Sequence, residues 1–202
     1  MAWTTLARLA KSGAVERVAH GVYRMRGTPA DDHIDVRAAW LQLAPDTTVW
    51  ERSSDQGVVC RRSAAAVYGL GHLPADIHQF TLPVRRQTRR ADVRLYKAGL
   101  ADNGWVRLAG LLVTRPSRIA ADLLADREDP EAVAHVIADA LRGIKDSPSE
   151  VAKTIAPCAA IFGLREGDGL TLLEWLLGLT QDSQGDFWMN AAHGALDRER
   201  KR

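Results

Sequence analysis

The amino-acid sequence predicts an α+β protein with a small helix-and-hairpin front, a mixed α/β middle and a helical back. Three observations predict this class. A short helix, a glycine and a basic hairpin come first, segments that alternate like strands dominate the next part, and apolar residues with the 3.6-residue helical period dominate the rest. We expect two domains, residues 1–28 and residues 29–202.

The first expected elements are a short helix and a tight hairpin. WTTLARLAKSG has apolar residues on one stripe and ends at Gly13, a residue type that often follows a helix. VERVAHGVYRM has His20-Gly21 where a two-residue type I′ turn needs positive φ. The register set by this turn makes four pairs: Ala19 with Val22, Val18 with Tyr23, Arg17 with Arg24, and Glu16 with Met25.

The two faces of this hairpin are expected to differ in chemistry. Side chains alternate across a strand, so Val18, Tyr23 and Met25 share an apolar face that needs a core. The opposite, basic face consists of three arginines: Arg17, Arg24 and Arg26. Like charges that are paired across a hairpin repel each other, and a polyanionic partner would relieve that repulsion.

Helix, glycine and basic hairpin follow the order of recognition helix and wing in a winged helix-turn-helix. In that module the helix enters the major groove of DNA, and wing arginines reach phosphates or the minor groove. A complete module has two more helices before the recognition helix. We therefore expect a truncated winged helix-turn-helix, or a start that lies upstream. The alternative is a surface helix and hairpin whose arginines are only solvated.

The middle of the chain is expected to mix helices and strands. DDHIDVRAAWLQLAP predicts a helix at residues 33–43 that supports the apolar face of the hairpin. TTVWE, IHQFTLPV and VRLYKA have strand character, with Trp50 in the core, and RRSAAAVYGLG predicts a helix capped by Ser63. WVRLAGLLVTRPSRIAADLLAD begins as a strand, bends at Gly110 and becomes a helix at Pro116.

The back of the chain is expected to be helical. Asp129 opens one helix, which Gly143 stops, and Ser147 caps the next, which Pro157 kinks or divides. LTLLEWLLGLT is apolar nearly all round, which indicates either the most buried helix or a partner interface. The last helix aligns four residues on its apolar side: Trp188, Ala191, Ala192 and Ala195.

The composition indicates neither a membrane span nor an export segment. Hydrophobic residues make up 46% and charged residues 26%, no run of about 18 apolar residues occurs, and the N-terminus lacks the pattern of a secretion signal. We therefore expect a cytoplasmic protein. Cys60 and Cys158 have no CxxC or Cys/His spacing nearby, so we expect buried free thiols rather than a disulfide or a zinc site.

The charge is strongly polarised along the chain. Residues 1–118 carry 18 basic and 10 acidic side chains, a net charge of +8, whereas residues 119–190 carry 5 basic and 13 acidic ones, a net charge of −8. A second basic cluster comprises Arg85, Arg86, Arg89 and Arg90. This cluster is expected either to contact nucleic acid or an acidic patch on a partner, or to be a solvated hairpin loop.

Signatures of catalytic and cofactor sites are absent from the sequence. The chain lacks the GxxxxGK[ST], HExxH, GxSxG and GxGxxG motifs, and its histidines are scattered without metal-ligand spacing. A nuclease would need clustered carboxylates and a lysine around Mg²⁺, and the basic strand region offers only Asp92 and Lys97. We expect a non-enzymatic protein without a cofactor or a metal.

Several segments in series resemble the AbiEi-type antitoxins of bacterial abortive-infection and toxin-antitoxin operons. These segments are LARLAKSGAVERVAHGVYR, RRSAAAVYGLG, HQFTLPVRRQTRRADVRLYKAGL and GLLVTRPSRIAADLLAD. The later run KTIAPCAAIFGLREGDGLTLLEWLLGL is similar to mycobacterial members of the family. The resemblance extends from about residue 4 to about residue 180, and its specificity lies in the order of the segments.

This resemblance implies a nucleotidyltransferase toxin as partner, a winged domain that binds promoter repeats, and a C-terminal domain with the antitoxin function. It implies DNA contacts for eight residues of the helix and wing: Thr4, Thr5, Arg8, Lys11, Arg17, His20, Arg24 and Arg26. The expected function is therefore to neutralise the toxin and to autoregulate the operon. The alternative is a stand-alone winged-helix transcriptional regulator without a toxin partner.

Overall fold

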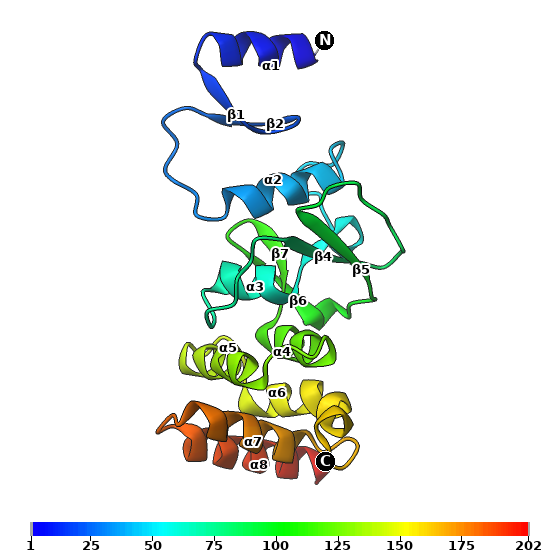
Figure 1. The fold of residues 1–202 in the computed structure, drawn as a ribbon, viewed down its shortest axis with the longest axis vertical. Coiled ribbons are helices and arrows are strands. Elements are labelled where there is room, and N and C mark those ends of the chain that lie inside the picture. The colour runs from blue at the N-terminus through cyan, green and yellow to red at the C-terminus, as the bar shows by residue number, and fades with distance from the viewer. Residues whose placement is uncertain (1, 202) are drawn as a thin grey trace.

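The elements of the chain form a stack of layers that runs from one terminus to the other (Figure 1). The computed structural model describes residues 2–201. The N-terminal helix lies at one end, a five-stranded sheet in the middle and the C-terminal helices at the other end. Helices and strands are both present, so the predicted α+β class is confirmed.

The front of the stack is a helix and a hairpin, as predicted. Helix α1 (Ala2–Lys11) precedes strands β1 (Val15–Ala19) and β2 (Val22–Met25), which form an antiparallel two-stranded sheet. The chain turns twice at left-handed glycines, Gly13 with a φ of +78° and Gly21 with a φ of +74°. Glycine adopts this conformation without the steric cost that other residues have, which is why the sequence predicted both turns.

The predicted register of the hairpin is wrong beyond its first pair. Ala19 pairs with Val22 as expected, but a β-bulge then shifts the strands at Val18. The remaining pairs are Arg17 with Tyr23, Glu16 with Arg24, and Val15 with Met25. A bulge adds one unpaired residue to one strand, and the two-residue turn does not reveal it. The two strand arginines therefore do not oppose each other.

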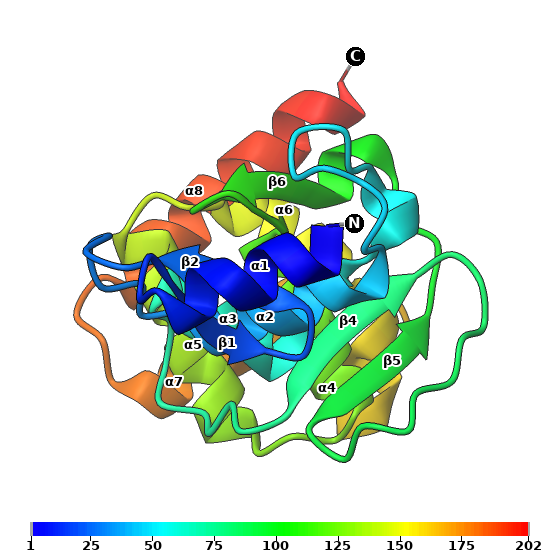
Figure 2. The same ribbon diagram turned by 90° about the horizontal axis from the view of Figure 1, so that it is seen from above.

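Helix α2 (Ile34–Leu43) lies under the hairpin and separates it from the sheet (Figure 1, Figure 2). The apolar side of the hairpin packs on this helix, as predicted. The residues that line the small cavity between them include Val18, Val22, Tyr23, Ile34 and Leu41. Met25 was expected on the same face but is 68% exposed, since it is the last residue of β2 and lies beyond the part of the strand that packs on α2.

Buried polar contacts fix the other side of α2. Trp40 Nε1 donates to the carbonyl oxygen of Gly57 at 2.7 Å. The guanidinium of Arg52 is buried, lies 4.4 Å from the Trp40 ring and donates to the Leu41 carbonyl at 2.7 Å. The segment TTVWE is a turn rather than the predicted strand, and Trp50 is 78% exposed, because Arg52 occupies the buried position beside this helix.

A mixed five-stranded sheet forms the middle layer. Its strands are β3 (Val58–Val59), β4 (His78–Leu82), β5 (Val93–Lys97), β6 (Trp105–Leu108) and β7 (Leu111–Thr114). They lie side by side in the order β5-β4-β3-β7-β6. The 3₁₀ helix η1 (Ser54–Gln56) precedes β3, and η2 (Asp102–Gly104) precedes β6. β6 and β7 form a tight hairpin around Ala109-Gly110, where only a bend was predicted. β4 and β5 are parallel, so residues 83–92 form a crossover and not a hairpin loop.

Helices α3 (Arg61–Tyr68) and α4 (Pro116–Ala125) lie on the side of the sheet away from α2 (Figure 1). Ser63 was predicted to cap α3, but the N-cap is Cys60 and Ser63 lies inside the helix. Its hydroxyl donates to the Ile77 carbonyl at 3.0 Å and accepts from the N–H of Gln79 at 2.9 Å. This serine therefore ties the helix to β4 rather than starting the helix.

The rest of the stack is helical. It comprises α5 (Pro130–Arg142), α6 (Pro148–Ile155), the 3₁₀ helix η3 (Ala156–Phe162), α7 (Gly169–Thr180) and α8 (Gly185–Arg200). Both predicted caps are confirmed, since Asp129 Oδ2 accepts from the N–H of Ala132 at 3.1 Å and Ser147 Oγ from that of Glu150 at 3.2 Å. Pro157 divides its helix as predicted, because η3 begins where α6 ends.

The last two helices complete the core. In α7, Leu172, Leu173, Leu176 and Leu177 are buried, whereas Trp175 is 40% exposed. In α8, Trp188 and Ala192 are buried, but Ala191, which was predicted to align with them, is exposed. The backbone of Gly169 at the start of α7 touches α6 so closely that a Cβ there would lie 1.9 Å from the Ala152 carbonyl oxygen.

Several predicted features can be checked over the described part of the chain. Cys60 and Cys158 are buried free thiols, as predicted. Between residues 2 and 201, no helix has the length and apolar character needed to span a bilayer, and no three His, Cys, Asp or Glu side chains are grouped as metal ligands. Met1 and Arg202, which belong to the expected start and to the basic tail, lie outside the described residues.

Candidate nucleic-acid interface

The four α1 residues predicted to contact DNA belong to the open side of the helix. Thr4, Thr5, Arg8 and Lys11 are all exposed. Leu6, Leu9 and Ala10 are half-buried, and α1 packs against β1. The polar side of α1 is thus accessible to a partner, as a recognition helix requires.

The predicted wing residues fall into different environments. Arg17 is exposed, and its Nη2 lies 3.1 Å from Nδ1 of His20 at the tip of the hairpin. Arg24 is half-buried and ion-paired with Glu16. Successive pairs of a strand ladder point to opposite faces, so Arg17 and Arg24 lie on opposite sides of the hairpin and not on one basic face. Arg26 is exposed after β2.

The second basic cluster lies on the crossover between β4 and β5, which we call the arginine loop (residues 83–92). Arg86 Nη1 donates to the Leu43 carbonyl at the end of α2 at 2.6 Å. Arg90 donates to Asp92 at 2.9 Å, and this bond lowers the pKa of the Asp92 carboxyl. Arg85 and Arg89 are exposed and have no hydrogen-bond or ion-pair partner within residues 2–201. Two arginines hold the loop in place, and the other two are available to a partner.

One side chain connects the wing to the arginine loop. Gln42 on α2 donates from Nε2 to the carbonyl oxygen of His20 at 2.6 Å, and its Oε1 accepts from Arg90. The amide group therefore bonds to both basic segments, which are far apart in the sequence. Sequence reasoning missed this residue because a glutamine on a helix carries no pattern that distinguishes it from a solvated one.

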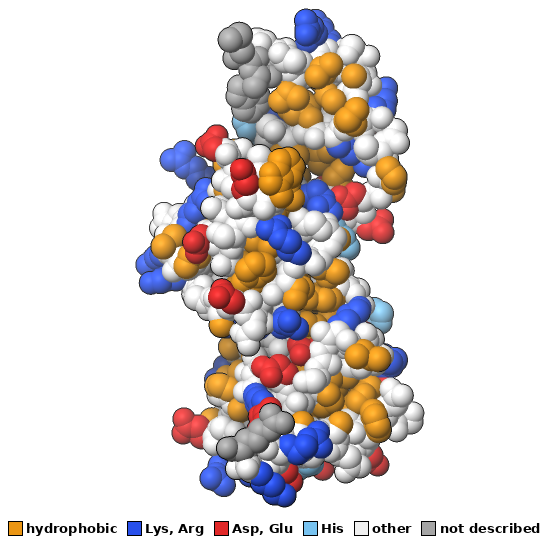
Figure 3. All heavy atoms as spheres, turned by 180° about the vertical axis from the view of Figure 1, so that it is seen from behind, with side chains coloured by type: hydrophobic (Ala, Val, Ile, Leu, Met, Phe, Trp, Pro, Cys, Tyr) orange, Lys and Arg blue, Asp and Glu red, His pale blue; other side chains and the backbone are white. Residues whose placement is uncertain are grey.

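We call α1, the wing (the β1–β2 hairpin with Arg26) and the arginine loop the basic end of the molecule. Its positive charge is not balanced by acidic side chains. Among the residues that the structure describes, seven of its cations have no acidic partner: Arg8, Lys11, Arg17, Arg26, Arg85, Arg86 and Arg89. At the helical end, by contrast, Arg142 and Lys153 each contact two carboxylates. Figure 3 shows basic side chains around the N-terminal layer, and acidic and basic side chains mixed over the layers below it.

The carboxylate and lysine considered for a nuclease do not form a site. Asp92 directly precedes β5 and binds Arg90, whereas Lys97 is the last residue of the same strand. A strand rises roughly 3.3 Å per residue, so the strand holds the two side chains too far apart to share a metal ion. This pair gives no support to metal-dependent phosphate cleavage.

Comparison with known proteins assigns no family. Neither a protein-family model nor a curated protein matches this chain. The expectation of an AbiEi-type antitoxin therefore stays a prediction. The inference of function rests on the basic end: the open side of α1, the tip of the wing, and the arginine loop joined to it by Gln42.

Proposed function

We propose that this protein is an antitoxin that binds operator DNA through its basic end and neutralises a cognate nucleotidyltransferase toxin with the domain behind it. The observation that carries the DNA part is the set of seven cations without acidic partners, gathered at one end from α1, the wing region and the arginine loop. Cations of this kind displace counterions from DNA phosphates, and that release supplies nearly all non-specific affinity.

The elements of the basic end suit different parts of a DNA duplex. α1 presents two threonines and two cations on its open side, a combination that can bind base edges and phosphates in the major groove. Arg17 and His20 at the wing tip suit an adjacent phosphate or the minor groove. Arg85 and Arg89 would extend the phosphate contacts beyond the winged segment.

The antitoxin part of the proposal is supported by the order of the resembling segments and by the opposite end of the molecule. Residues 119–190 carry a net charge of −8. Trp175, 40% exposed on α7, lies 5.5 Å from the Phe162 ring, so this end offers aromatic as well as acidic contacts. Exposed aromatic groups are enriched at protein interfaces. A toxin bound there would leave the basic end open to DNA.

DNA binding can be tested by fluorescence anisotropy with the DNA upstream of the gene, over a series of salt concentrations. We expect log K to fall linearly with log salt, with a slope of about −0.9 for each phosphate neutralised. Arg165→Gln, at the helical end, is the matched charge control and should leave the slope unchanged. Binding without salt dependence, or no binding at low salt, would contradict the DNA part.

The toxin part is tested by coexpression with the adjacent gene of the operon. We expect that gene to stop growth when expressed alone and growth to return when this protein is present. An adjacent gene that is harmless alone, or that stays toxic in the presence of this protein, would contradict the antitoxin part while leaving the DNA part open to its own test.

The second candidate is a stand-alone DNA-binding regulator. The concentration of unbalanced cations at one end favours it as much as it favours the antitoxin, because DNA binding needs nothing from the helical end. This candidate predicts the same steep salt dependence at the promoter, together with a neighbouring gene that is not toxic.

A further inference from the structure

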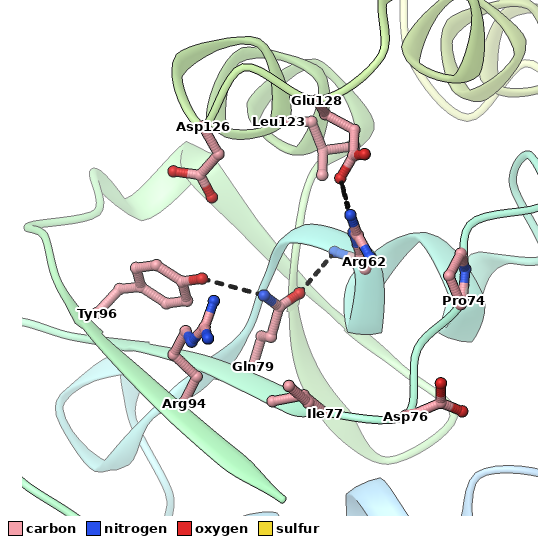
Figure 4. A pocket seen from close by; sticks show the side chains of 10 residues that line it. All are labelled: Arg62, Pro74, Asp76, Ile77, Gln79, Arg94, Tyr96, Leu123, Asp126 and Glu128. Atoms are coloured by element: carbon pink, nitrogen blue, oxygen red, sulfur yellow. Dashed lines mark hydrogen bonds and ion pairs between the residues drawn. The ribbon is translucent and has the colours of Figure 1, made fainter.

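A cavity of about 440 Å³ lies between α3, α4 and the strands β4 and β5, away from the basic end (Figure 4). Its volume falls in the range of roughly 300–1,000 Å³ that is common for small-molecule sites. The strands supply its polar floor, and Ile77 and Leu123 supply apolar surface. None of the residues proposed to contact DNA lines this cavity, and neither Phe162 nor Trp175 does.

The floor of the cavity is built from side chains that hold one another in place. The parallel register sets Gln79 of β4 beside Arg94 of β5, and Tyr96 lies on the same face of β5. Gln79 is 7% exposed, its Oε1 accepts from the N–H of Arg62 at 3.0 Å, and its Nε2 donates to the Tyr96 hydroxyl at 3.0 Å. The hydroxyl thus accepts from the amide and keeps its own proton for a ligand.

Two of the three acidic groups that line the cavity are already neutralised. Arg62 donates to Glu128 at 2.6 Å, and Arg61 donates to Asp126 at 2.6 Å while its guanidinium lies 3.5 Å from the centre of the Tyr96 ring. Arg94, in contrast, has no acidic partner among residues 2–201. In Figure 4 it lies beside Tyr96 and Gln79, whereas the remaining acid of the lining, Asp76, lies at the other side.

Strain and unpaired polar atoms are concentrated around this floor. Arg61 has a φ of 54°, a left-handed conformation that is costly for a residue with a Cβ. Thr81 Oγ1, two residues after Gln79 on the same face of β4, and Asp122 Oδ2, 3.8 Å from Arg61, are buried without a hydrogen-bond partner. These groups lie behind the floor, since none of the three residues lines the cavity.

We propose that this cavity binds a small molecule through a single carboxylate or phosphate monoanion, which the Arg94 guanidinium, the Tyr96 hydroxyl and the free N–H of Gln79 receive together. One anionic charge fits because one cation is unpaired, and the nearby carboxylates disfavour a ligand of higher charge. The apolar surface next to the floor accommodates the uncharged part of the molecule. This site is independent of the proposed function.

Inorganic phosphate at pH 6 and acetate are the two probes, because they separate the phosphate and carboxylate sources. Titration of the full chain is followed by NMR through the side-chain amide resonance of Gln79. We expect a saturable shift of that resonance with one probe or both. Arg94→Gln should raise the dissociation constant about tenfold and Tyr96→Phe about threefold, as the loss of a charged and of a neutral hydrogen bond predicts.

The matched control is Arg165→Gln, which removes an arginine outside the cavity and should leave the dissociation constant unchanged. Thermal unfolding of each variant identifies any that fails to fold, and Tyr96→Phe keeps the ring under Arg61, so it tests the site even if Arg94→Gln is unstable. The proposal is overturned if neither probe moves the Gln79 resonance, or if folded Arg94→Gln and Tyr96→Phe bind as the unchanged protein does. Phosphate shifts confined to the arginine loop would likewise overturn it.

Discussion

At the scale of single residues, the presence or absence of an acidic partner decides which cationic side chains are available to bind DNA phosphates. Arg17 and Arg24 look equivalent in the sequence, but only Arg24 is paired, with Glu16. The bulge at Val18 produces this difference, because it moves Glu16 opposite Arg24. A charge that is already balanced in the free protein releases few counterions when DNA binds.

Replacing Arg17 by Ala should therefore weaken binding to every DNA sequence. It should reduce the salt slope, the slope of log K against log salt concentration, by about 1 in magnitude, the value for one lost phosphate contact. The double variant Glu16→Gln with Arg24→Gln keeps the net charge and should leave the slope unchanged. Anisotropy over a salt series measures both. An equal loss of slope in the double variant would show that Arg24 leaves Glu16 to bind phosphate.

The reactivity of the two cysteines also depends on the surroundings of single residues. Burial raises the pKa of the Cys60 thiol to about 11 and raises the pKa of the Cys158 thiol as well. Since the thiolate is the reactive form, we expect neither to be alkylated by iodoacetamide in the native protein at pH 7.5, and both to react after unfolding. Mass spectrometry distinguishes the outcomes. Rapid native labelling at Cys60 would contradict the buried position of its side chain.

At the scale of elements, capping residues and close contacts between helices together decide where a helix begins. Asp129 and Ser147 cap α5 and α6 through bonds within three residues, so these helices start where the sequence predicts. Asp168 caps the start of α7 in the same way, but this start also involves a contact outside the helix, because its backbone at Gly169 lies against Ala152 of α6. Only a residue without a side chain allows the two helices to approach so closely.

Gly169→Ala should destabilise the fold by about 1–3 kcal/mol, the usual cost of overpacking, because its Cβ would overlap a backbone carbonyl that cannot rotate away. Gly178→Ala is the matched control in the same helix. A Cβ at Gly178 would meet nothing within 4 Å, so the substitution should be neutral or stabilising. Urea unfolding compares the two. Equal stability of both variants would rule out the close contact.

At the scale of the whole molecule, charge is separated between the two ends of the stack. The hairpin, α2 and the arginine loop form one basic unit through Gln42, and the helical layers lie on the other side of the sheet (Figure 1). This separation allows DNA and a toxin to be bound at different ends.

The double variant Arg85→Gln with Arg89→Gln should weaken promoter binding and reduce the salt slope by about 2, yet still neutralise the toxin. The expectation follows from the position of both arginines at the basic end without acidic partners. Anisotropy and coexpression measure the two properties on the same protein. If the variant loses neutralisation and keeps its salt slope, the arginine loop faces the toxin and not DNA.

The sequence by itself determined the features that depend on near neighbours. The glycine turns at Gly13 and Gly21, the caps at Asp129 and Ser147 and the break at Pro157 were predicted and confirmed, because each involves residues only a few positions apart. It also determined the overall division of charge along the chain.

Only the tertiary structure decided which distant groups meet. In the tertiary structure β4 and β5 are parallel, Trp50 is exposed and Arg52 is buried. Arg24 is paired with Glu16, and Gln42 bonds to both the wing and the arginine loop. None of these follows from periodicity or turn chemistry. Strand order, bulges and charge pairing are set by contacts between segments far apart in the chain, and their energies depend on packing that no local pattern contains.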